Sequence, residues 1–252
     1  MKKHSSVFML MARSTIYRVL GLLIVMVVAE AGLFWLRLQQ GAIDGNFSLE
    51  AIISESRLSW ACAAFFLFVN VILSWGSYTI SDTYTAARLS VSGKAVYLWQ
   101  CIYNTLCYLL FWMVQILIGI GLCRVYEALA PAEFVSNQTV FLAFYRSKFL
   151  HSFLPFEDTW VWVRNILLVV ALGVCSSRIP GKNRKIGIGS CILLAAVGVF
   201  FVQEIGDLTS VVFLILAAVL CWGYSQCGNI DYCCNYLRST CCWESFEQGG
   251  AG

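Results

Sequence analysis

Residues 96–123 read VYLWQCIYNTLCYLLFWMVQILIGIGLC, a run with no Asp, Glu, Lys or Arg. About 20 apolar residues in a helix cross the roughly 30 Å hydrocarbon core of a bilayer, so this stretch is long enough to span a membrane. Because lipid offers the backbone no hydrogen-bond partners, a spanning segment must pair its own N–H and C=O groups. The stretch therefore predicts a transmembrane helix.

Other apolar stretches of similar length occur on both sides of it, at Tyr17–Leu36, Trp60–Tyr78, Trp160–Cys175, Ile186–Val202 and Leu208–Tyr224. The composition agrees, since 60% of the 252 residues are hydrophobic and 12% are charged, against about 45–50% and about 25% in soluble domains. The sequence predicts an all-α, multi-pass membrane protein with about six transmembrane helices. It predicts a transmembrane domain over residues 1–224 and a polar, cysteine-rich tail over 225–252.

The basic residues predict the orientation, because Lys and Arg are retained on the cytoplasmic side. With both termini inside, the cytoplasmic segments hold Lys2, Lys3, Arg13, Arg18, Arg88, Lys94, Arg178, Lys182, Arg184, Lys185 and Arg238. The outer segments hold fewer, namely Arg37, Arg57, Arg124, Arg146, Lys148 and Arg164. We expect both termini in the cytoplasm and the chain in the inner (cytoplasmic) membrane of the cell, with the tail also cytoplasmic.

Two segments outside the predicted spans have amphipathic patterns. Residues 5–18 mix apolar side chains with Arg13 and Arg18, which predicts either a helix along the inner leaflet or a frayed, basic leader. The long connection 124–157 carries Phe141, Phe144, Tyr145, Phe149 and Phe153. These aromatic residues predict an interfacial helix on the bilayer.

The predicted inner loop between the second and third spans contains Arg88-Leu89-Ser90-Val91-Ser92 and then Lys94. Asp82 or Thr83 can cap a short helix here, and Ser92-Gly93 ends it before a new helix begins at Lys94. A short cytoplasmic helix between two spans is a projection onto which a soluble subunit could dock. The alternative is a basic loop that keeps positive charge inside.

At these residues the chain resembles the membrane subunits of type-2 ATP-binding-cassette exporters, which typically carry Arg-Leu-Pro-Val/Ile-Ser in this loop. Ser90 stands where that pattern has proline. The chain length, the six predicted spans and the amphipathic leader resemble the same family. The resemblance implies that Arg88, Leu89, Ser90, Val91, Ser92 and Lys94 form the loop that couples to an ATPase.

The same resemblance implies the partners and the mechanism. A separate cytoplasmic ATPase subunit would bind ATP and Mg²⁺, and the permease would form a homodimer or pair with a related permease subunit. ATP binding would close the ATPases, and the loop would transmit that motion to the spans. A different class of function, a non-transporting membrane scaffold or sensor, also fits a chain of this kind. Peptides, antibiotics, lipids and small drugs are all carried by proteins of this plan.

Four polar residues inside the predicted spans are candidates for a substrate pathway: Glu30, Asn70, Asn104 and Gln115. Glu30 could contact a cationic substrate or bind a proton, since acids inside membranes often have such roles. The favoured interpretation is simpler, with Glu30 paired to Arg37 or hydrated near the outer surface. We expect the three amides to form hydrogen bonds between helices, and Gly119, Gly121, Gly187, Gly189 and Gly198 to allow helices to approach closely.

Several chemistries are disfavoured by the residues present. The two histidines, His4 and His151, form no zinc motif, and no Gly-rich phosphate loop occurs. The tail cysteines (Cys227, Cys233, Cys234, Cys241 and Cys242) lack zinc-knuckle spacing, and a net charge of +3 is too small to indicate nucleic-acid binding. We therefore expect no catalytic residues, no metal site and no cofactor in this chain.

Overall fold

The computed structural model describes residues 2–44, 48–81, 93–131, 135–136, 138–154 and 159–177, with the single positions 211, 215 and 218. Within these ranges every element is an α-helix and no strand occurs, so the described part of the chain is all-α as predicted. The predicted fifth span, almost all of the sixth, the loop residues 82–92 and the tail 225–252 lie outside the described residues.

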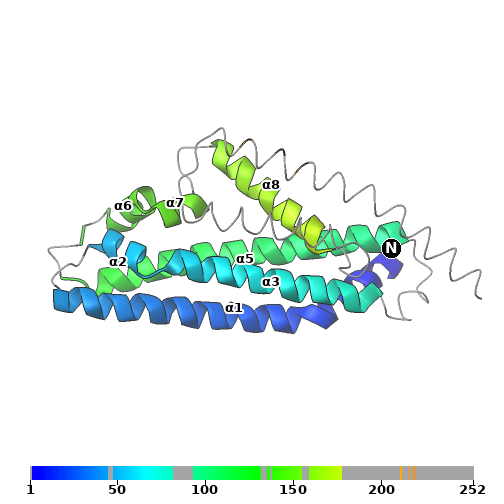
Figure 1. The fold of residues 1–252 in the computed structure, drawn as a ribbon, viewed down its shortest axis with the longest axis horizontal. Coiled ribbons are helices and arrows are strands. Elements are labelled where there is room, and N and C mark those ends of the chain that lie inside the picture. The colour runs from blue at the N-terminus through cyan, green and yellow to red at the C-terminus, as the bar shows by residue number, and fades with distance from the viewer. Residues whose placement is uncertain are drawn as a thin grey trace, which may run out of the picture.

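Four of the described helices are long and apolar enough to cross a membrane (Figure 1). They are α1 (Lys2–Asp44), α3 (Leu58–Ser81), α5 (Gly93–Leu129) and α8 (Thr159–Ser176). The mean hydropathy of their candidate spans lies between 1.6 and 2.4. The first four spans predicted from the sequence are therefore confirmed as long apolar helices.

Two of these helices are longer than a bilayer requires. Helix α1 has 43 residues and α5 has 37, which correspond to about 65 Å and about 55 Å at 1.5 Å per residue. The hydrocarbon core of a membrane is roughly 30 Å thick. Both helices therefore extend beyond the lipid core and provide surfaces against which shorter segments pack.

The amino-terminal segment 5–18 does not form a helix separate from the first span. Helix α1 is continuous from Lys2, and its candidate span begins at Phe8. Phe8 packs edge-on against Trp99 and Tyr103 of α5, with ring centroids 6.1 and 5.7 Å away, and Met11 is buried. Residues 5–18 are therefore helical and continuous with the first span, because no Gly or Pro interrupts them, and the partly buried Phe8 packs on α5.

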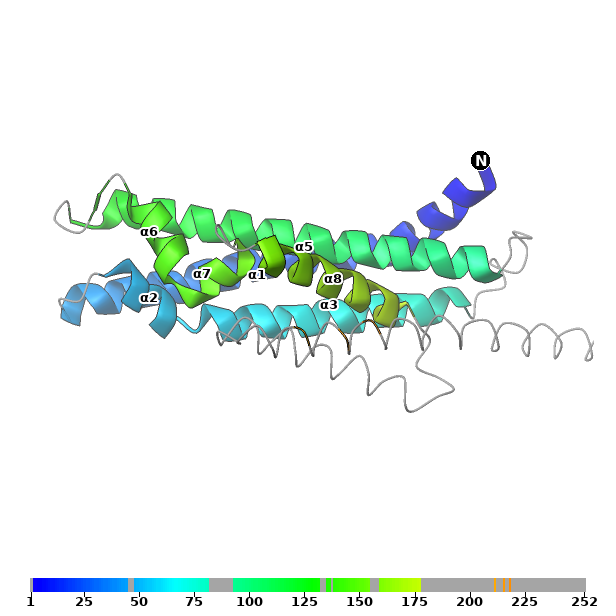
Figure 2. The ribbon, with the colours of Figure 1, turned by 90° about the horizontal axis from the view of Figure 1, so that it is seen from above.

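The four long helices lie side by side in a bundle (Figures 1 and 2). Helix α1 packs against α3 and α5, and α5 also packs against α8. Helices α1 and α5 run in the same direction, whereas α3 and α8 run in the opposite direction (Figure 2). The loop between α3 and α5 therefore begins and ends at the end of the bundle where α1 also begins.

Three short helices cover the opposite end of the bundle (Figure 1). They are α2 (Leu49–Glu55), α6 (Thr139–Arg146) and α7 (Lys148–Phe153). Ser147 ends α6 in an extended conformation and caps α7, because its hydroxyl accepts a hydrogen bond from the Leu150 amide at 3.5 Å. At the same end, the Asn165 side chain of α8 donates a hydrogen bond to the Ser152 carbonyl at 2.8 Å.

The aromatic residues of α6 and α7 divide between the bundle and its outer surface. Phe144, Phe149 and Phe153 are buried, whereas Phe141 and Tyr145 are exposed. The predicted helical structure of this connection is confirmed, although it consists of two helices rather than one. Three of these five aromatic side chains pack into the protein, so the segment is part of the bundle rather than a helix that lies only on lipid.

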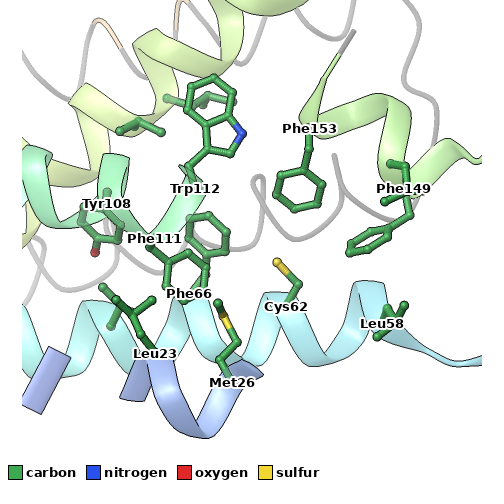
Figure 3. Packing of buried hydrophobic residues seen from close by; sticks show 14 of the residues in the cluster. Leu23, Met26, Leu58, Cys62, Phe66, Tyr108, Phe111, Trp112, Phe149 and Phe153 are labelled. Atoms are coloured by element: carbon green, nitrogen blue, oxygen red, sulfur yellow. The ribbon is translucent and has the colours of Figure 1, made fainter. Parts of the chain in front are cut away.

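Figure 3 shows the core where the helices meet. Phe66 of α3 packs against Phe111 of α5 with ring centroids 4.5 Å apart, and Met26 and Phe153 are buried in the same cluster. Five described cysteines are buried thiols outside any disulfide bond: Cys62, Cys101, Cys107, Cys123 and Cys175. Buried thiols of this kind pack as small apolar side chains.

Candidate functional site

The four polar residues selected from the sequence are all buried in the bundle. Glu30 is 0% exposed, Asn104 is 2%, Gln115 is 3% and Asn70 is 6%. The structure does not bring all four together. Asn104 and Gln115 are eleven positions apart on α5, which corresponds to a rise of about 16 Å, so the polar residues form two separate groups.

The first group is a direct hydrogen bond between α1 and α5, here called the Glu30–Gln115 pair. The Gln115 Nε2 donates to Glu30 Oε2 at 2.8 Å. The expected pairing of Glu30 with Arg37 was wrong, because Arg37 donates instead to Gln40 on its own helix at 2.8 Å. Seven residues on a helix are two turns, so Arg37 shares a face with Glu30 but lies about 10 Å further along the axis.

The surroundings of this pair are apolar. Met26 and Phe34 lie one turn on either side of Glu30 on α1, and both are fully buried. Cys62 of α3 lies close enough to Glu30 to interact with it electrostatically, and it too is buried. A charged side chain deep in a membrane costs roughly 2.5 kcal/mol or more, so an acid at this position requires a specific partner.

One oxygen of each side chain in the pair lacks a hydrogen-bond partner. Glu30 Oε1 and Gln115 Oε1 are both buried and have no hydrogen-bond partner. Buried polar atoms are nearly always paired, and an unpaired one costs about 1–3 kcal/mol. The Glu30–Gln115 pair therefore leaves two hydrogen-bond acceptors unsatisfied in the interior of the bundle.

The α6–α7 segment closes the bundle about one turn beyond Gln115. Gly119 of α5 has no side chain, and a Cβ built there would lie 3.0 Å from Leu150 Cδ2 and 3.6 Å from Phe144 Cζ. The prediction that Gly119 permits close approach is confirmed. Gly121, by contrast, is exposed, and no described atom lies within 4 Å of a Cβ built there, so the described helices make no close contact at Gly121.

The second group, here called the Asn104 cluster, consists of Asn70, Ser77, Asn104, Tyr108, Ser176 and Ser177. Asn104 Nδ2 on α5 donates to the hydroxyls of Ser176 and Ser177 at 3.0 and 3.1 Å. The Ser77 hydroxyl of α3 donates to the Ser176 carbonyl at 3.0 Å. These bonds connect three helices, as expected for polar residues that hold membrane helices together.

Asn70 contributes less than the other amides. Its Oδ1 accepts a hydrogen bond from Ser74 of the same helix at 3.3 Å, and its Nδ2 is buried without a partner. The Tyr108 hydroxyl lies near Asn70 and Ser176 but also lacks a hydrogen-bond partner. The prediction of bonds between helices is therefore confirmed for Asn104 and Gln115 and is not met by Asn70.

The approach of α1 and α3 beside this cluster is close. The hydroxyls of Thr15 and Tyr103 lie 2.7 Å apart, and a Cβ at Gly76 would collide with the Thr15 methyl group. Together with Gln100 and Asn104 these residues line a gap that is too narrow for a water molecule. The described helices are therefore closed at this level and leave no space for a substrate.

Sequence reasoning missed the two glycines with the tightest contacts. Gly76 meets Thr15, and Gly173 of α8 lies against Thr105 of α5, where a Cβ would be 2.9 Å from both the Thr105 nitrogen and Cα. A glycine inside an apolar helix is the signal that points to such a contact. The same signal that predicted close approach at Gly119 is present in the sequence at Gly76 and Gly173.

The predicted coupling residues lie mostly outside the described part of the chain. Residues 82–92, with Arg88, Leu89, Ser90, Val91 and Ser92, are not described. Lys94 lies in the first turn of α5, which begins at Gly93, one residue before the predicted start. The loop is thus bounded by two helices with buried polar side chains, namely Asn70 and Ser77 on α3 and Asn104 and Gln115 on α5.

Comparison with known proteins gives no match. The chain matches no protein-family model, no curated protein and no solved structure.

Proposed function

We propose that this chain is the permease subunit of an ATP-binding-cassette exporter, in which a separate cytoplasmic ATPase supplies the energy. The observation that carries the proposal is the packing of α3 and α5, the two helices that the segment with Arg88 joins in sequence. Both helices pack on α1 and carry buried polar side chains. A force applied to this loop would therefore reach the interior of the bundle through two helices at once.

The distribution of charge supports the orientation that this function needs. The end of the bundle where α1 and α5 begin holds Lys2, Lys3, Arg13 and Lys94, and the loop with Arg88 joins it. The opposite end holds the acidic residues Asp44, Glu50, Glu55 and Glu127 together with the basic residues Arg37, Arg57, Arg124, Arg146 and Lys148. Over the whole sequence the predicted inner segments hold eleven Lys and Arg and the outer segments six, so by the rule that positive charge stays inside the loop would face the cytoplasm, where a soluble ATPase can reach it.

The buried polar residues would form part of the route across the membrane. In alternating access, helices separate first on one side of the membrane and then on the other. The closed gap beside Thr15 and the closed contact at Gly119 fit a resting conformation between such openings. Glu30, Asn70, Asn104 and Gln115 would then become accessible when α1, α3 and α5 move apart.

In this proposal the chain itself breaks no bond. ATP and Mg²⁺ belong to the partner ATPase, and a second permease subunit, identical or related, completes the pathway. The chain has six spans and both termini inside, and it lies in the inner membrane of the cell. The competing function is a membrane scaffold or sensor, which the closed packing of the described helices also fits.

The test is purification of the tagged chain from its native membrane in mild detergent, followed by an assay for co-purifying ATPase activity. We expect an ATPase subunit to be retained, and to be lost with Arg88→Glu or Leu89→Asp. Arg146→Glu is the matched control, because Arg146 is exposed at the end of α6 on the opposite end of the bundle. It should leave the complex unchanged.

Two results would contradict the proposal. If both loop variants retain the ATPase as well as the unsubstituted chain does, the loop is not the docking site. If the unsubstituted chain purifies without any nucleotide-hydrolysing subunit, the scaffold or sensor function is favoured instead.

A further inference from the structure

We propose that Glu30 and Gln115 form a proton-binding site, in which a proton on Glu30 Oε1 makes a second hydrogen bond to Gln115 Oε1. The first hydrogen bond of the pair, from Gln115 Nε2 to Glu30 Oε2, is 2.8 Å long. The two remaining oxygens are the ones that lack partners. The site is separate from the proposed coupling loop, so the inference does not depend on whether an ATPase binds.

The hydrogen-bonding capacity of the two side chains leads to this conclusion. An ionised carboxylate is an acceptor on both oxygens, and an amide oxygen is an acceptor as well. Glu30 Oε1 and Gln115 Oε1 therefore cannot bond to each other while Glu30 is ionised. One added proton turns Glu30 Oε1 into a donor, with no covalent bond broken, and both buried oxygens are then satisfied in a carboxylic acid–amide pair.

No basic side chain among the described residues pairs with Glu30 in place of a proton. The basic residues closest in sequence to the pair are otherwise engaged, since Arg37 donates to Gln40 and Arg124 forms an ion pair with Glu127, at 2.8 and 2.9 Å. Arg124 is also exposed at the far end of α5. A charged Glu30 would therefore be buried without a compensating positive charge among the described side chains, a costly arrangement.

The side chains that the neighbouring helices place near Glu30 favour the neutral, protonated form of its carboxyl group. From α3 the titratable group is Cys62, a buried thiol, and from α5 it is the neutral amide of Gln115. The acids of α2, Glu50 and Glu55, are exposed. Nothing in this set stabilises a negative charge on Glu30 beyond the one amide hydrogen bond.

A metal ion fits the site less well than a proton. Hard cations such as Ca²⁺ take six or more oxygen ligands, and Mg²⁺ requires near-octahedral geometry. The buried residues one turn from Glu30 on α1, Met26 and Phe34, and the neighbouring thiol of Cys62 offer carbon and sulfur rather than oxygen. The pair can supply two free oxygens, which is what a single proton needs.

The site makes the closed bundle dependent on pH. Protonated Glu30 holds α1 to α5, whereas separation of the helices would admit water and allow Glu30 to ionise. Because the closed state binds one more proton than the open state, acid favours the closed state and its stability decreases as pH rises. Proton release would therefore accompany opening between α1 and α5.

Infrared spectroscopy of the purified full chain in lipid tests the protonation directly. We expect a carboxylic acid C=O band, above the amide region, at neutral pH in the unsubstituted chain, and its loss in Glu30→Gln. Glu55→Gln is the matched control, because Glu55 is exposed, and it should leave this band in place. If the Glu30→Gln difference spectrum contains carboxylate bands and no acid band, Glu30 is ionised and the proposal is wrong.

Thermal unfolding in detergent at a series of pH values tests the consequence. Glu30→Gln replaces the protonated acid with an amide that can donate to Gln115 Oε1 without a proton, so we expect retained folding and loss of the pH dependence. In the unsubstituted chain, loss of one proton on opening changes the equilibrium by at most about tenfold per pH unit. A Glu30→Gln chain with unaltered pH dependence would contradict the proposal.

A further measurement distinguishes proton binding at this site from binding of a monovalent cation. At fixed pH, addition of Na⁺ should leave the unfolding temperature of the unsubstituted chain no different from that in choline chloride at the same ionic strength. Specific stabilisation by Na⁺ that disappears in Glu30→Gln, combined with no acid band, would assign the site to a cation instead.

Discussion

Gly173 of α8 and Thr105 of α5 lie so close that a Cβ on Gly173 would be 2.9 Å from the backbone nitrogen and Cα of Thr105. A backbone cannot move aside as a flexible side chain can, so α5 and α8 must separate to accept even a methyl group. Small residues allow membrane helices to pack at this distance. The contact sets how closely the Asn104 cluster can assemble, because Ser176 and Ser177 follow Gly173 in the next turn.

We therefore expect Gly173→Ala to lower the free energy of unfolding by about 1–3 kcal/mol, the usual cost of overpacking a core. Gly121→Ala is the control, because Gly121 is exposed with nothing within 4 Å. It should be neutral or stabilise α5 by about 0.5–1 kcal/mol. Unfolding in detergent, followed by circular dichroism, measures both, and equal stability of the two variants would show that α8 is not packed against Thr105.

The close contact between Gly76 and Thr15 predicts a destabilising substitution and a second substitution that restores stability. A Cβ on Gly76 would collide with the Thr15 methyl group, so Gly76→Ala should destabilise the chain by about 1–3 kcal/mol. Thr15→Ser removes that methyl group while it retains the hydroxyl that bonds to Tyr103.

The double variant with Gly76→Ala and Thr15→Ser should therefore recover most of the lost stability. The measurement is a double-mutant cycle on the free energy of unfolding, with Thr15→Ser alone as the reference. Simple additivity of the two changes would mean that Gly76 and Thr15 do not touch.

The Thr15–Tyr103 hydrogen bond connects α1 to α5. The two hydroxyl oxygens are 2.7 Å apart, and Thr15 also donates to the Met11 carbonyl at 3.2 Å. Tyr103→Phe should cost about 0.6 kcal/mol, the typical value for such bonds between membrane helices. Tyr17→Phe is the control, because Tyr17 is exposed, and a loss of similar size there would show that the Tyr103 bond is not responsible.

The α6–α7 segment should contribute to stability as part of the bundle. Phe153 is 2% exposed and Phe141 is 54% exposed. Phe153→Ala leaves a cavity and should cost about 3–5 kcal/mol, whereas Phe141→Ala should change the stability by less than about 0.5 kcal/mol. Chemical unfolding in detergent distinguishes them. If the two substitutions have the same effect, this segment lies on lipid as the sequence pattern alone predicted.

The long helices could be predicted because the relevant signal is local. Residues 96–123 form a helix with or without the correct neighbours, since any backbone in lipid must pair its own polar groups. The same reasoning placed the other three described spans. It left residues 5–18 open, because a mixture of basic and apolar side chains is typical both of a helix on lipid and of a helix packed on another, as Phe8 is on Tyr103.

The partners of the buried polar residues could not be predicted in the same way. From the sequence Glu30 had one obvious partner, Arg37, two turns along the same helix. Its observed partner, Gln115, is 85 residues away and becomes a neighbour only because α1 and α5 run parallel at one particular register. A shift of α5 by a single turn would place Phe111 or Gly119 opposite Glu30 instead.

The sequence by itself determined that the described chain is helical, where its long helices lie and which polar side chains they bury, because these follow from hydrophobic length and from backbone pairing within each segment. Tertiary structure decided which of those side chains meet. It joined Glu30 to Gln115, placed Gly173 against Thr105 and folded α6 and α7 onto the bundle. The physical reason is that contacts between helices depend on their relative direction, register and rotation, which are set by packing across the whole bundle.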